Sequence, residues 1–159
     1  MTIEPRITTM TFAQDLASFF SRDLLRMVEQ LRLFPNDEAV WATPPGITNS
    51  AGTLTLHIDG NLREYIGRQL GGVSYTRDRP AEFSARGVPK DELLVRIAEL
   101  CELIPSIVAR LSDAQIEAVY PEKVFDAPMR TGEFLLHLYG HLNWHRGQLD
   151  YVRRIVTQG

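Results

Sequence analysis

Apolar residues recur with the period of an α-helix along four long segments of the chain, and no segment shows the alternation of apolar and polar residues that is typical of a strand. The four segments cover about residues 11–34, 51–70, 89–111 and 131–156. Each is long enough for several helical turns, and most of the prolines lie outside them. The pattern therefore predicts an all-α protein whose four helices pack as a bundle.

Polar residues near the ends of these segments predict where helices begin and end. Thr11 and Gln14 have the spacing of a capping box at the start of the first helix. Asn49 or Ser50 is suited to cap the second helix, and the pair at 71–72, both glycines, is suited to end it. These local signals agree with the apolar period.

Two connections, residues 73–88 and 112–130, are longer than the turns that usually join bundle helices. Long ordered loops often shape a binding site, and plain surface crossovers of this length are equally common. A chain of 159 residues falls within the size of one domain, so we expect residues 1–159 to form a single four-helix-bundle domain.

The overall charge and the cysteine content exclude several classes of protein. The net charge is −3, so the chain lacks the basic field that favours a nucleic acid or an acidic membrane surface. Cys101 is the single cysteine, which excludes an internal disulfide and a multi-cysteine zinc site. Met1–Phe12 has no apolar core of a signal peptide, and no stretch reaches the roughly 18 apolar residues of a membrane span. We therefore expect a cytoplasmic protein with neither a nucleic-acid nor a membrane partner.

The histidines are the main candidates for chemistry. His141 and His145 lie four residues apart in the last segment, on the same face of a helix as apolar residues such as Leu138 and Leu149. The pair is therefore predicted to point towards the interior, where an unpartnered imidazole is unfavourable. The opposite side, predicted to face solvent, carries Asn143, Arg146, Asp150 and Arg154.

His57 is ambiguous from periodicity alone. It shares one side of the second helix with other polar residues, namely Thr53, Asn61, Glu64 and Arg68. Such a stripe is either a solvated face or one wall of a wet pocket. Asn61, Glu64 and Arg68 would line that pocket.

An inward-facing pair of histidines four residues apart is either hydrogen-bonded for structural reasons or ligates a metal, since neutral imidazole is a common metal ligand. Leu142 follows His141, so the His-Glu-x-x-His pattern of zinc proteases is absent. If His57 is the third ligand, three neutral imidazoles leave the ion its full charge and an open position, as in catalytic sites.

Other polar residues are candidates for supporting roles. Gln148, three residues after His145, is suited to hydrogen-bond to that ligand, and His137 is expected to support the site or the fold rather than ligate. Asp23 lies among apolar residues of the first helix, where it either orients a ligand or substrate or occupies the rim of an imperfect apolar stripe.

Three stretches of the sequence resemble one family. The segment Phe134–Gln148 is similar to the His-x-x-x-His-x-Gly-Gln ending of the DinB-like (DinB/YfiT-like) family of metal-dependent four-helix-bundle proteins. Leu56–Leu62 resembles the ligand segment of the family's second helix, and Val124–Pro128 is a weaker match. The resemblance covers most of the chain.

The resemblance implies a divalent ion, often zinc or nickel, held by His57, His141 and His145, and frequently a homodimer. It also links the chain to bundles that use low-molecular-weight thiols, among them thiol-dependent transferases and maleylpyruvate isomerase. From it we expect a metal-dependent thiol S-transferase acting on a small-molecule substrate, with the thiol as a second cofactor. The alternatives are a metal-water hydrolase and a non-enzymatic dimeric bundle that binds a metal.

Overall fold

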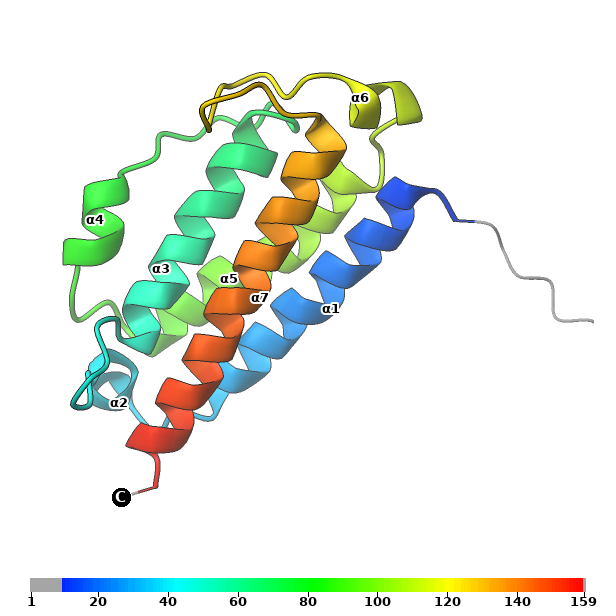
Figure 1. Cartoon of the computed structure of the whole chain (residues 1–159). Coiled ribbons are helices and arrows are strands. Elements are labelled where there is room, and N and C mark those ends of the chain that lie inside the picture. Colours follow the sequence, from blue (N-terminus) through cyan, green and yellow to red (C-terminus); the bar gives the residue numbers. More distant parts are fainter. Residues whose placement is uncertain (1–9, 159) are drawn as a thin grey trace, which may run out of the picture.

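Four long helices lie side by side (Figure 1), and their apolar faces meet in one core. The computed structural model describes residues 10–158. The long helices are α1 (Phe12–Arg32), α3 (Ala51–Leu62, continued by the π-helix η1, Arg63–Arg68), α5 (Lys90–Val108) and α7 (Thr131–Val156). The connections contain the short helices α2 (Asp37–Trp41), α4 (Arg79–Ser84) and α6 (Asp113–Glu117). The prediction of an all-α four-helix bundle is confirmed.

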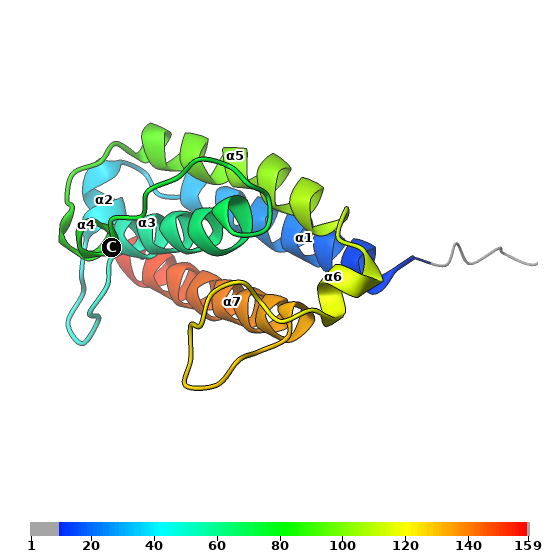
Figure 2. The ribbon, with the colours of Figure 1, turned by 90° about the horizontal axis from the view of Figure 1, so that it is seen from above.

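The long helices are arranged so that α1 and α3 each pack against both α5 and α7. Figure 2 shows α5 and α7 on opposite sides of the bundle, with α1 and α3 between them. In Figure 1, α3 and α5 run in the same direction, so the chain must return along the bundle between them. Residues 73–88 make this return, and α4 within them packs against α3.

The ends of the helices follow the local polar signals in most places. Thr11 and Gln14 form both hydrogen bonds of the capping box, and the hydroxyl of Ser50 accepts a hydrogen bond from the Thr53 amide in the first turn of α3. The prediction of an α-helix over 51–70 is wrong in its last part, where η1 has π geometry. A π turn holds about one more residue than an α turn, and apolar spacing over six residues does not resolve that difference.

Every residue of α3 is buried, although α3 carries many polar side chains. Helices α2, α4, α5 and α7 all pack against it, so no side of α3 faces solvent. His57 is only 6% exposed, which excludes the alternative of a solvated polar face.

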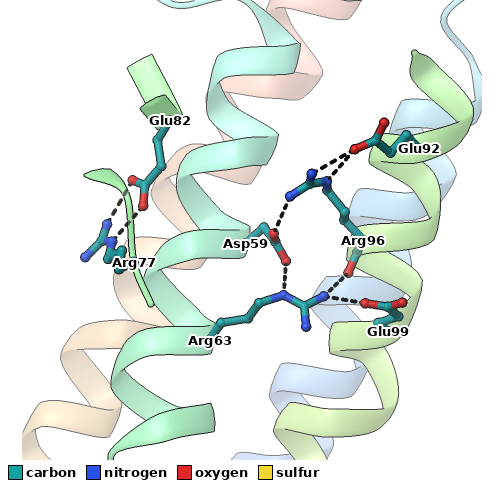
Figure 3. Close-up of polar contacts among 7 residues, drawn as sticks. All are labelled: Asp59, Arg63, Arg77, Glu82, Glu92, Arg96 and Glu99. Atoms are coloured by element: carbon teal, nitrogen blue, oxygen red, sulfur yellow. Dashed lines mark hydrogen bonds and ion pairs between the residues drawn. The ribbon is translucent and has the colours of Figure 1, made fainter. Parts of the chain in front are cut away.

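Two separate polar clusters lie beside this buried helix, as Figure 3 shows. On the side towards α5, the Asp59 carboxylate accepts a hydrogen bond from Arg63 at 2.6 Å and lies 3.5 Å from Arg96. Burial raises the pKa of Asp59, and the two guanidinium groups oppose that increase. This cluster joins α3 to α5. The pair of Glu82 and Arg77 lies on another side of α3.

The solvent-facing side of α7 differs from the prediction. Asn143, Arg146 and Asp150 are half-buried, and only Arg154 of that predicted face is exposed. Two of these residues have partners within the chain: Asp150 accepts from Arg153 and Arg154, and Asn143 donates to a main-chain carbonyl. Four large apolar residues of α7 are also exposed: Leu136, Trp144, Tyr151 and Ile155.

Among the described residues, no helix is long and apolar enough to cross a membrane. The expectation for Met1–Phe12 concerns residues that mostly lie outside the described range, 10–158. The cytoplasmic location stays a prediction.

Candidate metal centre

Three histidine side chains from two helices converge at one point between α3 and α7. Each of His57, His141 and His145 offers one ring nitrogen, and these nitrogens all lie within 4.8 Å of one another. The Nε2 atom of His141 is 3.1 Å from the Nε2 atoms of both His57 and His145. Two zinc-bound imidazole nitrogens in a tetrahedral site are about 3.3 Å apart, since each Zn–N bond is about 2.0–2.1 Å. The spacing of the nitrogens is therefore suitable for a metal ion.

The outer nitrogens of two of these rings have acceptor partners. His57 Nδ1 donates to Glu82 Oε2 at 2.9 Å, and His145 Nδ1 donates to Gln148 Oε1 at 2.7 Å. A carboxylate oxygen and an amide oxygen only accept, so in the neutral rings the proton resides on Nδ1. The Nε2 atoms of His57 and His145 then present bare lone pairs to the centre.

His141 cannot satisfy both of these lone pairs. A neutral imidazole carries a single N–H, so His141 Nε2 donates to at most one neighbour and at least one close N···N contact contains no hydrogen. Within residues 10–158 the Nδ1 atom of His141 is buried without a hydrogen-bond partner. A cation at the centre would accept all three Nε2 lone pairs and would leave each proton on Nδ1.

The electrostatic setting keeps the two rings from α7 neutral. Burial, together with the neighbouring His145, His57 and His137, lowers the pKa of His141 to about 3. Burial also lowers the pKa of His145, partly opposed by the hydrogen bond to Gln148. Both rings are thus in the form that ligates metals at neutral pH.

Glu82 positions His57 and is itself held by two groups. Burial raises the pKa of Glu82, but the hydrogen bonds from His57 and Arg77 outweigh this effect and hold the pKa below its ordinary value. Arg77 donates to both carboxylate oxygens, at 2.6 and 2.9 Å (Figure 3). A Cβ atom at Gly60 of α3 would overlap the Glu82 carboxylate, so the approach of α4 requires glycine there.

Sequence reasoning did not identify Glu82 or Arg77. They lie in the 73–88 connection, 25 residues from His57 in the case of Glu82, where no periodic pattern indicates which face a residue occupies. Asp78 caps α4 and Pro80 follows in its first turn, which is the one local signal of this helix.

The candidate supporting residues differ in where they lie. His137 is exposed and is not among the converging histidines; its ring stacks on Phe134 with centroids 5.9 Å apart. Asp23 is fully buried, which corrects the prediction of a rim position. Its carboxylate accepts hydrogen bonds from Arg22, Arg26 and the Tyr139 hydroxyl, and none from the three histidines. Asp23 therefore joins α1 to α7. Its charge is tolerated among the apolar residues of α1 because these partners compensate it.

Asn61, Glu64 and Arg68 continue along α3 and η1 beyond His57. Glu64 and Arg68 form an ion pair and line a hollow of about 540 Å³, together with Arg77 and Arg79. Asn61 is 7% exposed, is not on that wall, and its Oδ1 has no hydrogen-bond partner among the described residues. Arg77 connects the hollow to His57 through Glu82.

The comparisons with known proteins agree with this fold. The chain is similar to a crystal structure of a conserved protein from Enterococcus faecalis, with a TM-score of 0.75 and 17% identity over 95% of this chain and 100% of that one. It is also similar to a DinB-like protein from Bacillus cereus, with a TM-score of 0.67 and 16% identity over 87% and 89% of the two chains.

No protein with a curated description matches the sequence. A model of the DinB superfamily matches residues 20–149, which include all three converging histidines. This chain belongs to the DinB superfamily.

Proposed function

We propose that His57, His141 and His145 hold a divalent metal ion, zinc or nickel, and that the protein transfers a low-molecular-weight thiol to an electrophilic small molecule. The convergence of three Nε2 lone pairs, which three neutral imidazoles cannot satisfy by hydrogen bonds, supports the metal ion. The thiol transfer follows from the resemblance of the sequence to bundles that use low-molecular-weight thiols. A divalent ion in such a site lowers the pKa of a bound thiol or water towards neutrality.

The ligand set favours a reactive centre over a closed structural one. Structural zinc sites usually have four protein ligands, whereas three histidines leave a position for a small molecule. No fourth His, Cys, Asp or Glu joins the group among residues 10–158. Glu82 and Gln148 orient their histidines from outside and would keep the ligands in place during a reaction.

The protein's own thiol is not suited to be the nucleophile. Cys101 lies on α5, outside the histidine cluster, and burial raises the pKa of its thiol, so it is protonated at neutral pH. An external thiol supplies the sulfur instead. It gives up its proton, its sulfur bonds to the electrophilic carbon, and the leaving group departs with the electron pair of the broken bond.

The hollow beside Arg77 is a suitable place for one of the two reactants. It is lined by the guanidinium groups of Arg68, Arg77 and Arg79 and by the carboxylates of Glu64 and Glu122. Arg68 pairs with Glu64, while Arg79 lies over the ring of Phe83, 5.4 Å from its centroid. Phe83 in turn packs on His57, with ring centroids 4.9 Å apart. A reactant with an anionic group would be attracted to Arg79 near the cluster.

The test combines metal analysis with an activity assay. The purified protein is analysed for bound metals, stripped with a chelator, reloaded with zinc or nickel, and mixed with an aryl halide and a panel of small thiols. We expect consumption of the thiol only with metal, and its loss in His141→Ala but not in His137→Ala. Absence of transfer with every thiol and metal, in protein that binds the metal, would refute the thiol transferase.

Two other functions give different results in the same experiment. A metal-water hydrolase would cleave an activated ester without any thiol. A non-enzymatic bundle would show no turnover, and chelation would lower its melting temperature. If His57→Ala loses the metal but keeps the melting temperature, a structural role for the metal is excluded.

A further inference from the structure

A second hollow, of about 320 Å³, lies where the connection between α2 and α3 meets the last turns of α7. It is lined by residues 46–49 of the connection, by Leu54 of α3 and by Gln148, Tyr151 and Val152 of α7. Figure 1 shows this connection and the last turns of α7 at the same end of the bundle. The hollow shares no lining residue with the arginine-lined hollow described above. Its volume falls within the range of small-molecule sites, roughly 300–1,000 Å³.

The wall that the connection contributes is held by a β-turn. The Ile47 amide donates to the Pro44 carbonyl at 2.9 Å, which closes a turn with Pro45 and Gly46 at its centre. Proline is favoured at the first central position of a type II turn, and Gly46 has the positive φ, 82°, that the second position needs. Because the turn restrains this wall, the hollow is formed before anything binds, which reduces the entropy lost on binding.

The lining of this hollow is partly apolar and carries no charged residue. Leu54 and Val152 are buried and supply the apolar part of the wall. The polar members of the lining are Thr48, Asn49, Gln148 and Tyr151. Burying a charge without an opposite charge beside it is costly, whereas an uncharged group needs only a hydrogen bond. The hollow therefore favours a neutral molecule over an anion or a cation.

Gln148 gives the hollow a hydrogen-bond donor in a fixed orientation. Its Oε1 accepts from His145 Nδ1 at 2.7 Å. If the amide turned over, its NH₂ group would meet the N–H of His145 and this hydrogen bond would be lost. The carbonyl end is thus held by His145, and the NH₂ group is left for another partner. A molecule in the hollow must supply an acceptor, and the carbonyl oxygen of a ketone or an amide is a neutral group that does so.

We propose that this hollow binds a small neutral molecule with an apolar body and a carbonyl group, and that the carbonyl oxygen accepts a hydrogen bond from Gln148 Nε2. The apolar body packs on Leu54 and Val152. The chemistry of this site differs from that of the arginine-lined hollow, which attracts an anionic group. The protein thus offers two sites of different ligand class beside one histidine cluster.

Gln148 also links this site to the candidate metal centre. A bound carbonyl that holds the NH₂ group keeps Oε1 on His145, and so keeps the His145 ring in the orientation that ligates. Occupancy of the hollow and metal binding therefore favour each other, by the same factor in both directions. This link rests on the proposed metal ion, whereas binding of the neutral molecule does not.

Three planar probes of nearly equal size test the site: acetophenone, benzoate and benzamidine, which are neutral, anionic and cationic. Each is titrated into isotopically labelled, metal-free protein at neutral pH, and binding is followed by the NMR signals of the backbone amides. We expect acetophenone to shift the signals of residues 46–49 and 148–152 in a saturable way. Benzoate and benzamidine should bind at least about tenfold more weakly, because each must bury a charge in an uncharged lining.

Gln148→Glu tests the role of the donor. Its carboxylate still accepts from His145 Nδ1, but it presents an acceptor and a negative charge to the hollow in place of the NH₂ group. Benzamidine should then bind at least about tenfold more tightly than acetophenone. Thr48→Trp, at an exposed position of the lining, should fill the hollow and abolish the binding of acetophenone. Thr43→Trp, exposed on the same connection but outside the lining, is the matched control and should leave binding unchanged.

The substituted positions are exposed, so the melting temperature should show that each variant folds. Failure of acetophenone to bind up to its solubility limit would overturn the proposal, and so would binding that Thr48→Trp leaves unchanged. An unaltered preference in Gln148→Glu would overturn the role of the glutamine.

The link to the metal centre has its own measurement. Acetophenone should bind at least about twofold more tightly to protein that contains zinc. Equal binding to protein whose zinc content has been measured would overturn the link, whereas protein that takes up no zinc would refute the proposed metal ion instead.

Discussion

Gly60→Ala is expected to weaken metal binding without changing any ligand. A Cβ atom at this position would overlap Oε1 and Cδ of Glu82. The Glu82 carboxylate accepts from Arg77 and from His57 Nδ1, so it cannot move without lengthening one of these hydrogen bonds. We expect the hydrogen bond to His57 to lengthen, which frees the ring that Glu82 holds towards the other two histidines.

The expected loss of zinc affinity follows from the role of a carboxylate that orients a ligating histidine. Loss of a carboxylate that orients a ligating histidine typically weakens metal binding 10- to 100-fold, which is about 1.4–2.7 kcal/mol. In the metal-free protein the lost hydrogen bond to a charged group costs about 1.5–3 kcal/mol, while alanine in place of glycine contributes about 1 kcal/mol in the other direction. The metal-free variant should therefore lose about 1 kcal/mol of stability.

Competition with a chromophoric chelator measures the zinc affinity, and urea unfolding of the metal-free protein measures stability. Gly67→Ala is the matched control, since its Cβ would lie 3.7 Å from Leu103, an ordinary contact. In a Glu82→Ala background, Gly60→Ala should have no further effect on zinc affinity. Equal zinc affinity of Gly60→Ala and the unchanged chain, with a weaker Glu82→Ala, would refute this account of how α4 supports the site.

Three further outcomes are expected. First, the pKa of His141 is lowered from 6.5 to about 3 in the folded protein, so between these pH values the unfolded state binds a proton that the folded state does not. The metal-free protein should therefore lose up to about 1.4 kcal/mol of stability for each unit by which the pH falls from about 6.5 to about 3. Urea unfolding of His141→Gln should show a smaller dependence of stability on pH, and an equal dependence would contradict the assignment. Second, His145→Ala should abolish tight zinc binding while His137→Ala keeps it, as measured by chelator competition; a large loss in His137→Ala would make that residue a ligand. Third, Asp23→Asn should destabilise the protein by about 2 kcal/mol at unchanged zinc affinity, because its carboxylate accepts only from Arg22, Arg26 and Tyr139 among the described residues. Calorimetry measures the loss of stability, and a changed affinity in a zinc titration would show that Asp23 has a role in the site.

Much of the bundle was predictable because the apolar period extends over many turns. The four long helices lie within or close to the predicted segments, and the capping box at Thr11 is present. The short helices α2, α4 and α6 were not predicted, since five or six residues carry too few apolar positions to define a face. The exposed row on α7 was also missed, because an apolar side chain on the outside of a helix carries the same local signal as one in the core.

The candidate site was likewise predictable only in part. The spacing of His141 and His145 places them on one face of any helix, so the sequence alone determined that the two rings lie together. Whether His57 faces solvent or that pair depended on α4 and α7 covering α3 on sides that an isolated helix would expose. Glu82 reaches His57 only because the chain must return along the bundle between two parallel helices. Periodicity along one helix determines which residues share a face, whereas contacts between segments far apart in the chain determine what that face meets, and those contacts exist only in the folded protein.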